Sequence, residues 1–248
     1  MIVANIASYP ARSDTLPTVL DAIHMQVDVV NLVLNEYTQI PDWIQKYKNI
    51  LATIPKTDLK DTGKFLPEFH HGDMVLLMDD DIGYPPDYVT SSIWRWEKLA
   101  NERAIAGYHA STYKRPTLNF LQEAGITLDF FRDKIFQYRD VLFFGFALDQ
   151  NQSVDQLGSG TLVARASSLP PFSYMHDAQR FVDVRLARWA FEQRIPMISL
   201  PRNDSWIKPL KTSETIFETF TVNSPEYVSR EILSFVLPEI PQWKKNIK

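Results

Sequence analysis

The chain has 248 residues, 45% hydrophobic and 23% charged, a balance ordinary for a globular protein that can bury one sizeable core. Its net charge of −4 argues against a nucleic-acid binder that works through bulk positive charge, and the absence of cysteine excludes disulfides, thiol catalysis and Cys-ligated zinc. The first residues lack a basic segment followed by a long apolar run, and no stretch is long enough for a membrane span, so we expect a cytoplasmic protein.

The start of the chain reads as alternating strands and helices. An apolar run predicts a first buried strand over 2–7, and apolar residues at helical spacing predict a helix over 16–23. The same reasoning predicts a second strand over 27–34 and a second helix over 41–51. The polar segment 57–67 reads as a loop that leads into a short helix.

The middle of the chain is less regular. An unbroken apolar run predicts a strand over 74–78 that is buried on both faces. A helix with a core stripe from 89 to 100 and a strand over 104–108 follow. Residues 138–148, rich in Phe and Val, predict another strand. The glycines within 157–163 favour a tight turn or a close backbone approach to a ligand.

The last third predicts a strong helix over 177–194, a short strand over 195–200 and a terminal helix over 226–236. Strands that alternate with helices from the start of a chain are typical of an α/β protein. The sequence therefore predicts a doubly wound, mostly parallel central sheet flanked by helices, in a single domain.

Three adjacent carboxylates, Asp79, Asp80 and Asp81, come directly after the strand predicted over 74–78. Ligands of open α/β sheets bind just beyond the carboxyl ends of the strands. Alternate residues of an extended segment point the same way, so Asp79 and Asp81 can converge on one Mg²⁺ or Mn²⁺ ion that shares its coordination with substrate phosphates. The alternative is that the carboxylates cap the helix that starts near Pro86, although Asp79 lies too far upstream for that.

Four stretches, in this order, resemble the GT-A fold glycosyltransferases, which use nucleotide-sugar donors. They are residues 7–12 after the first strand, 58–67 before the central strand, the Asp-x-Asp motif with its continuation over 79–85, and 158–160 followed by the helix that contains Asp183. The similarity is greatest to bacterial enzymes that build surface polysaccharides.

The resemblance implies a single GT-A-like domain over 1–248. Residues 1–110 would be the half that binds the nucleotide sugar, and 111–248 the acceptor-binding half with a C-terminal tail. The implied activity transfers a sugar from a nucleoside-diphosphate sugar, by default a UDP-sugar, to a glycan, a lipid-linked glycan or another hydroxyl acceptor. The implied cofactor is Mn²⁺ or Mg²⁺.

The resemblance also implies roles for individual residues. Asp81 would bind the divalent ion that bridges the donor's phosphates, and Asp79 would contact the ribose or share the ion. His176 and Asp204 are candidates for a further metal ligand. The residues expected at the nucleotide sugar are Ser8, Tyr9, Arg12, Asn35, Glu36, Asp58, Lys64, Asp79 and Asp80.

An inverting transfer needs a base that deprotonates the acceptor hydroxyl. Asp183 is the first candidate and Asp177 the second. The chain departs here from the common pattern of two adjacent acidic residues, because Val182 precedes Asp183. The alternative for Asp183 is a surface carboxylate paired with a nearby arginine.

Five arginines follow or flank this region, and they suit either an anionic acceptor or a solvated helix face that pairs with Glu192 and Asp183. They are Arg180, Arg185, Arg188, Arg194 and Arg202.

Three other functions stay open. A magnesium-dependent phosphohydrolase of the haloacid-dehalogenase type would have Thr or Val where this chain has Gly83, and its motif near the N-terminus. A sugar nucleotidyltransferase would have a Gly-rich loop after the first strand, whereas residues 8–12 contain no glycine. A non-catalytic carbohydrate-binding relative could use the six Trp and ten Tyr residues for stacking on sugars.

The C-terminus allows two further expectations. Trp243, Lys244 and Lys245 could make peripheral contact with the inner face of a membrane. The proline-rich end could instead pack on a second copy of the chain and form a homo-oligomer.

Overall fold

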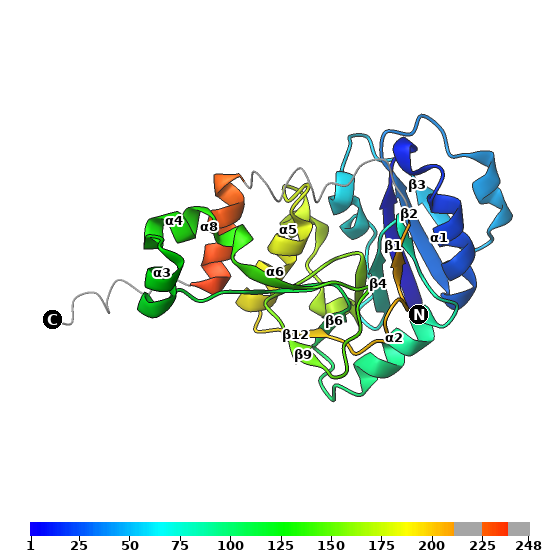
Figure 1. Ribbon diagram of the computed structural model, residues 1–248. Helices are drawn as coiled ribbons and strands as arrows, with labels where there is room; N and C mark the ends of the chain where they lie inside the picture. The colour runs from blue at the N-terminus through cyan, green and yellow to red at the C-terminus, as the bar shows by residue number, and fades with distance from the viewer. Residues whose placement is uncertain (211–224, 238–248) are drawn as a thin grey trace.

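The computed structural model of the protein describes residues 1–210 and 225–237. An eight-stranded sheet forms its centre, with helices on both faces (Figure 1). The strands, in spatial order, are β3 (Ile50–Thr53), β2 (Val29–Leu34), β1 (Ile2–Ser8), β4 (Met74–Met78), β11 (Thr161–Arg165), β6 (Ile105–Gly107), β12 (Met197–Ser199) and β9 (Gln152–Ser153).

The sheet is mostly parallel. Strands β3, β2, β1 and β4 run parallel to their neighbours, and so does the pair of β6 and β12. Strand β11 is antiparallel to both β4 and β6, and β9 is antiparallel to β12. This confirms the predicted α/β class with a mostly parallel central sheet in a single domain.

Strand β4 is buried along its whole length because both faces of the sheet are covered. Val75 and Leu77 belong to the core under α6 (Val182–Glu192) and α8 (Glu226–Val236). Leu76 and Met78 belong to the opposite core, under α1 (Leu16–Ile23) and α2 (Tyr88–Glu97). The period-two alternation of a strand thus supplies both cores at once.

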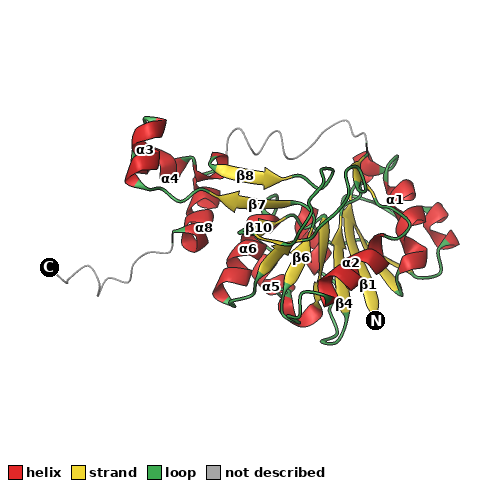
Figure 2. Cartoon of the chain, turned by 60° about the horizontal axis from the view of Figure 1, so that its bottom comes forward, coloured by secondary structure: helices red, strands yellow, loops and turns green. Residues whose placement is uncertain are grey.

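A smaller antiparallel sheet projects beside the central sheet (Figure 2). It contains β10 (Gln156–Leu157), β7 (Ala110–Tyr113) and β8 (Arg139–Leu142), and the short helices α3 (Leu118–Ala124) and α4 (Leu128–Asp133) lie between β7 and β8 in the chain. The other strands and α-helix of the described residues are β5 (Ile82–Gly83) paired with β13 (Lys208–Pro209), and α5 (Phe172–Met175).

Several predicted bounds were wrong. The helix expected over 41–51 is a 3-10 helix over Asp42–Lys46 followed by β3, an edge strand with alternating exposure. Of the strand expected over 138–148 only β8 exists. The helix expected from 177 begins at Val182, because Arg180 has a left-handed backbone (φ 71°) that a helix cannot include.

In the two described ranges, no helix is long and apolar enough to cross a membrane. The terminal residues Trp243, Lys244 and Lys245 lie outside the described residues.

Candidate active site

The order of the strands reverses between β1 and β4. From β1 the chain proceeds to β2 and β3 on one side, and β4 is then added on the other side of β1. The crevice at such a switch point is where open α/β sheets bind ligands. Ser8 ends β1 and the three aspartates follow β4, so the fold brings these two predicted groups together.

Arg12 joins the two strand ends. Its side chain is buried, with Nη2 3.2 Å from Asp81 Oδ2 and Nε 3.7 Å from Asp80 Oδ1. It also lies over the ring of Tyr9, 5.6 Å from the centroid. A buried cation next to several carboxylates is favourable only where the charges balance, so Arg12 stabilises the acidic cluster before any ligand binds.

The three aspartates differ in environment. Asp80 is buried, and this burial raises its pKa to about 7 against the opposing influence of the Ser8 hydroxyl. Asp81 is partly exposed, and burial together with the charge of Asp79 raises its pKa. Two carboxylates that repel each other at the edge of solvent are suited to a shared cation.

Asp79 is fixed by its neighbours. Its carboxylate forms an ion pair with the buried Lys64, and its backbone N–H donates to the Tyr84 hydroxyl at 2.8 Å. Tyr84 in turn donates to the carbonyl of Gly160 at 2.6 Å. A Cβ atom at Gly160 would lie 1.9 Å from Asp79 Oδ2, so only glycine leaves room for this carboxylate.

The candidate base belongs to the same network. Asp183, in the first turn of α6, accepts a hydrogen bond from the backbone N–H of Ser159 at 2.8 Å. Burial raises the pKa of Asp183. Burial disfavours the Lys64 ammonium, but Asp79, Asp183 and Asp61 outweigh this effect and raise the pKa of Lys64.

The residues after β2 that were predicted to contact the nucleotide form hydrogen bonds with the loop before β4. Asn35 accepts from the backbone N–H of Leu59 and donates to the carbonyl of Lys60, both at 2.9 Å. Asp58 pairs with Lys60 at 3.1 Å and lies beside Glu36, whose φ is 61°. Both side-chain amide atoms of Asn35 are therefore used within the protein.

Several predicted residues lie elsewhere. Asp177 pairs with Arg185 at 2.5 Å. His176 is exposed and bonds the Ser173 carbonyl through Nδ1, and Asp204 is exposed and accepts from the hydroxyl of its neighbour, Ser205. The structure does not bring these three side chains to the aspartates after β4.

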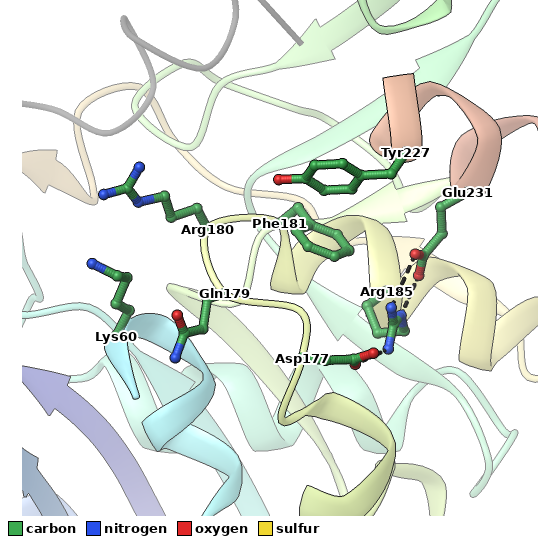
Figure 3. Close-up of a pocket in the computed structure, with 8 residues that line it drawn as sticks. All are labelled: Lys60, Asp177, Gln179, Arg180, Phe181, Arg185, Tyr227 and Glu231. Carbon is green, nitrogen blue, oxygen red and sulfur yellow. Dashed lines mark hydrogen bonds and ion pairs between the residues drawn. The ribbon is translucent and has the colours of Figure 1, made fainter. Parts of the chain in front are cut away.

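The five arginines do not form one cluster. Arg188 pairs with Glu192 along α6, and Arg202 is buried and donates to Ser199, Leu200 and Phe143. Arg194 is exposed after the end of α6. Arg180 and Arg185 line a common pocket (Figure 3).

Sequence reasoning missed three residues of the site. Gly160 was noted only as part of a glycine pair, and Tyr84 only as part of the Asp-x-Asp continuation. His109, between β6 and β7, packs against Gly158, and burial lowers its pKa to about 4. A histidine directly after a buried strand was the available signal for it.

The residues present fit a divalent ion of the Mg²⁺ type. No three His, Asp or Glu side chains of residues 1–210 and 225–237 form a metal-binding group by themselves. Such ions are usually held by one or two carboxylates together with substrate phosphates, and Asp79 and Asp81 supply that number.

No protein-family model matches the chain, and no curated protein matches its sequence. Several solved structures match the fold of the chain. Glucosyl-3-phosphoglycerate synthase from Mycobacterium tuberculosis, in complex with Mn²⁺, uridine-diphosphate-glucose and phosphoglyceric acid, has a TM-score of 0.50 and 12% identity, over 97% of this chain and 81% of that chain. The same synthase with uridine diphosphate has a TM-score of 0.47 and 13% identity, over 96% and 79%.

At such low identity the match shows the fold and nothing finer. It extends over 97% of this chain. The protein therefore has the GT-A fold, as its four motif stretches predicted.

Proposed function

We propose that the protein is a glycosyltransferase that moves a sugar from a nucleoside-diphosphate sugar, by default a UDP-sugar, to a hydroxyl acceptor. The observation that carries the proposal is the acidic cluster at the switch point, where Asp79 and Asp81 lie beside two buried cations, Arg12 and Lys64. The solved structure with TM-score 0.50 supports it, since that enzyme was crystallised with Mn²⁺ and uridine-diphosphate-glucose.

The donor would bind in the crevice between the ends of β1 and β4. Asp81 and Asp79 would hold Mn²⁺ or Mg²⁺, which would offset the charge that develops on the leaving diphosphate. Arg12 and Lys64 are fixed cations at the same place and would stabilise that charge further. Tyr9 and Glu36 would contact the nucleoside.

Asp183 would act as the base in an inverting transfer. Its raised pKa suits proton abstraction, because a stronger base removes the proton of a hydroxyl more readily. The hydrogen bond from the Ser159 N–H fixes the orientation of its carboxylate. The proposed acceptor is a glycan or a lipid-linked glycan of the kind found in bacterial surface polysaccharides.

Calorimetric titration with UDP, GDP and CDP, with and without Mn²⁺, tests the donor site. We expect one diphosphate to bind in a metal-dependent manner, and Asp81→Ala to weaken this binding at least about 100-fold, because an ion held by two carboxylates loses one of them. Asp129→Ala, which removes an exposed carboxylate on α4, is the matched control. Binding that depends neither on the metal nor on Asp81 would refute the donor site. It would favour the phosphohydrolase and non-catalytic alternatives.

Asp183→Asn tests the base. This variant keeps the acceptor atom for the Ser159 hydrogen bond but cannot take up a proton. We expect transfer to fall by about 10²–10⁴-fold, measured as release of the nucleoside diphosphate in the presence of acceptor. The affinity for nucleotide and metal should stay nearly unchanged, and unchanged turnover would remove Asp183 from this role.

A further inference from the structure

A second pocket lies where the segment before α6 meets the loop before β4 and the start of α8 (Figure 3). Its volume is about 500 Å³, enough for a small polar molecule. We name it the basic pocket. The residues that line it are Lys60, Asp177, Gln179, Arg180, Phe181, Arg185, Tyr227 and Glu231.

The two sides of the basic pocket differ in charge. On one side, Arg185 pairs with two carboxylates, Asp177 at 2.5 Å and Glu231, which together outweigh its charge. On the other side lie Lys60 and Arg180 (Figure 3). Lys60 has one carboxylate partner, and no acidic side chain of the described ranges pairs with the Arg180 guanidinium. An arginine at the wall of a pocket without a carboxylate partner is available to an anion.

The backbone holds both cations in place. Lys60 and Arg180 have left-handed φ angles of 50° and 71°, a conformation uncommon for long side chains. Asp58 fixes the first by accepting from the Lys60 N–H at 2.9 Å, and Asp61 fixes the second by accepting from the Arg180 N–H at 2.7 Å. Unfavourable backbone angles that the surroundings impose tend to occur at binding sites.

An aromatic wall lies between the two sides. The rings of Phe181 and Tyr227 are 5.3 Å apart, and Tyr227 is half exposed. Pockets for small molecules typically combine such apolar surface with a few fixed polar groups. The wall gives an acceptor a surface for its carbon skeleton, beside the groups that would bind its charge.

We propose that the basic pocket binds a phosphate group of the acceptor, between Arg180 and Lys60. The inference rests on the function proposed above and specifies its acceptor as a phosphate-bearing hydroxyl compound. Guanidinium offers paired donors to phosphate oxygens, and the Lys60 ammonium, which Asp58 also contacts, adds a point charge on the same side of the pocket. Asp183 follows Arg180 closely in the sequence, in the first turn of α6, so a short segment of chain connects the pocket to the candidate base.

The test is a titration of the full chain with glycerol 3-phosphate while UDP and Mg²⁺ saturate the donor site. Arg180→Gln should weaken binding about ten-fold or more, because it removes charge-assisted hydrogen bonds. Arg194→Gln is the matched control, since Arg194 is exposed, lies outside the pocket and also has a left-handed φ (54°). Glycerol, which lacks the phosphate, should not bind measurably to any of the three proteins.

Equal affinity of Arg180→Gln and Arg194→Gln for glycerol 3-phosphate would overturn the proposal, and so would a wild type that does not bind it. UDP affinity is measured in the same samples. A loss of phosphate binding with intact UDP binding supports the basic pocket. If UDP and Mg²⁺ do not bind the wild type, the donor site is refuted instead. The titration with glycerol 3-phosphate in the absence of UDP then tests the basic pocket by itself.

The phosphate could belong to a soluble compound or to a lipid. Co-sedimentation with phosphatidylcholine vesicles that contain phosphatidic acid separates the two sources. Sedimentation that Arg180→Gln abolishes and Arg194→Gln retains would assign the phosphate to a lipid-linked acceptor. Binding of glycerol 3-phosphate without sedimentation would assign it to a soluble one.

Discussion

Gly160 determines where the Asp79 carboxylate can lie. A methyl group at this position would come within 1.9 Å of Asp79 Oδ2 and 2.5 Å of its Cγ, so the whole carboxyl group would have to rotate away. We therefore expect Gly160→Ala to weaken metal-dependent nucleotide binding about ten-fold or more, since ligands displaced by an ångström lose metal affinity. Calorimetry with Mn²⁺ and the diphosphate identified for the wild type measures this.

Gly72→Ala is the control for that substitution, because its added methyl group would meet no atom within 4 Å. It removes the same backbone freedom without touching the site and should bind nucleotide as the wild type does. If Gly160→Ala and Gly72→Ala bind the nucleotide equally well, metal-dependent nucleotide binding does not require the present position of the Asp79 carboxylate.

The residues of the site were predictable to different degrees. The aspartates after β4 were found because adjacent charges after a buried apolar run need solvent, a cation or a ligand. The importance of Gly160 was not found from the sequence. It depends on the antiparallel pairing of β11 with β4, whose register puts this residue beside Asp79. Such a register is a long-range property that local patterns do not encode.

At the scale of elements, periodicity predicted most strands and helices. It predicted the residues at which they begin and end least well. Strand β11 was not separated from the glycine stretch before it, because its three apolar residues, 162–164, are too few to distinguish a strand from other structures. The start of α6 was placed too early because the break occurs at Arg180, a residue with no turn preference. Hydrogen bonds from other parts of the chain impose that break, which explains why the sequence does not show it.

One ion pair connects two elements that are distant in sequence. Glu231 of α8 is buried and binds Arg185 of α6 through both carboxylate oxygens, one of them at 3.1 Å. Glu231→Gln keeps the shape but leaves the arginine with Asp177 alone. We expect a loss of about 1–3 kcal/mol in the free energy of unfolding, measured in urea.

The control for Glu231 lies on the same helix. Glu226 forms an exposed pair with Arg230 one turn later. Glu226→Gln should cost at most about 0.5 kcal/mol, because solvent screens such pairs. A similar loss in both variants would mean that burial of the Glu231 pair adds no stability.

At the scale of the whole molecule, the two parts of the chain share one sheet. Strands β11 and β12 lie beside β4 and β6, although they come from the second half of the sequence. The roles of 1–110 in donor binding and of 111–248 in acceptor binding stay predictions. Hydrogen bonds between the two parts include Gln179 to the Asp58 carbonyl at 2.9 Å and the Arg180 N–H to the Asp61 carboxylate at 2.7 Å.

Asp61 should make the stability of the whole molecule depend on pH. Burial raises its pKa to about 6 in the folded protein, from an ordinary value of 3.8. Between these values the folded state binds more protons than the unfolded state, so stability decreases as pH rises through that window. The free energy of unfolding of the wild type should fall by about 3 kcal/mol across this window. Asn at position 61 does not titrate, so the free energy of unfolding of Asp61→Asn relative to the wild type should rise by about the same amount between pH 4 and pH 7, measured in urea. Asp129→Asn, at an exposed position of α4, should follow the wild type at both pH values. A constant difference between wild type and Asp61→Asn across the window would show that the Asp61 carboxyl is not held in its protonated form at the contact between the two parts of the chain.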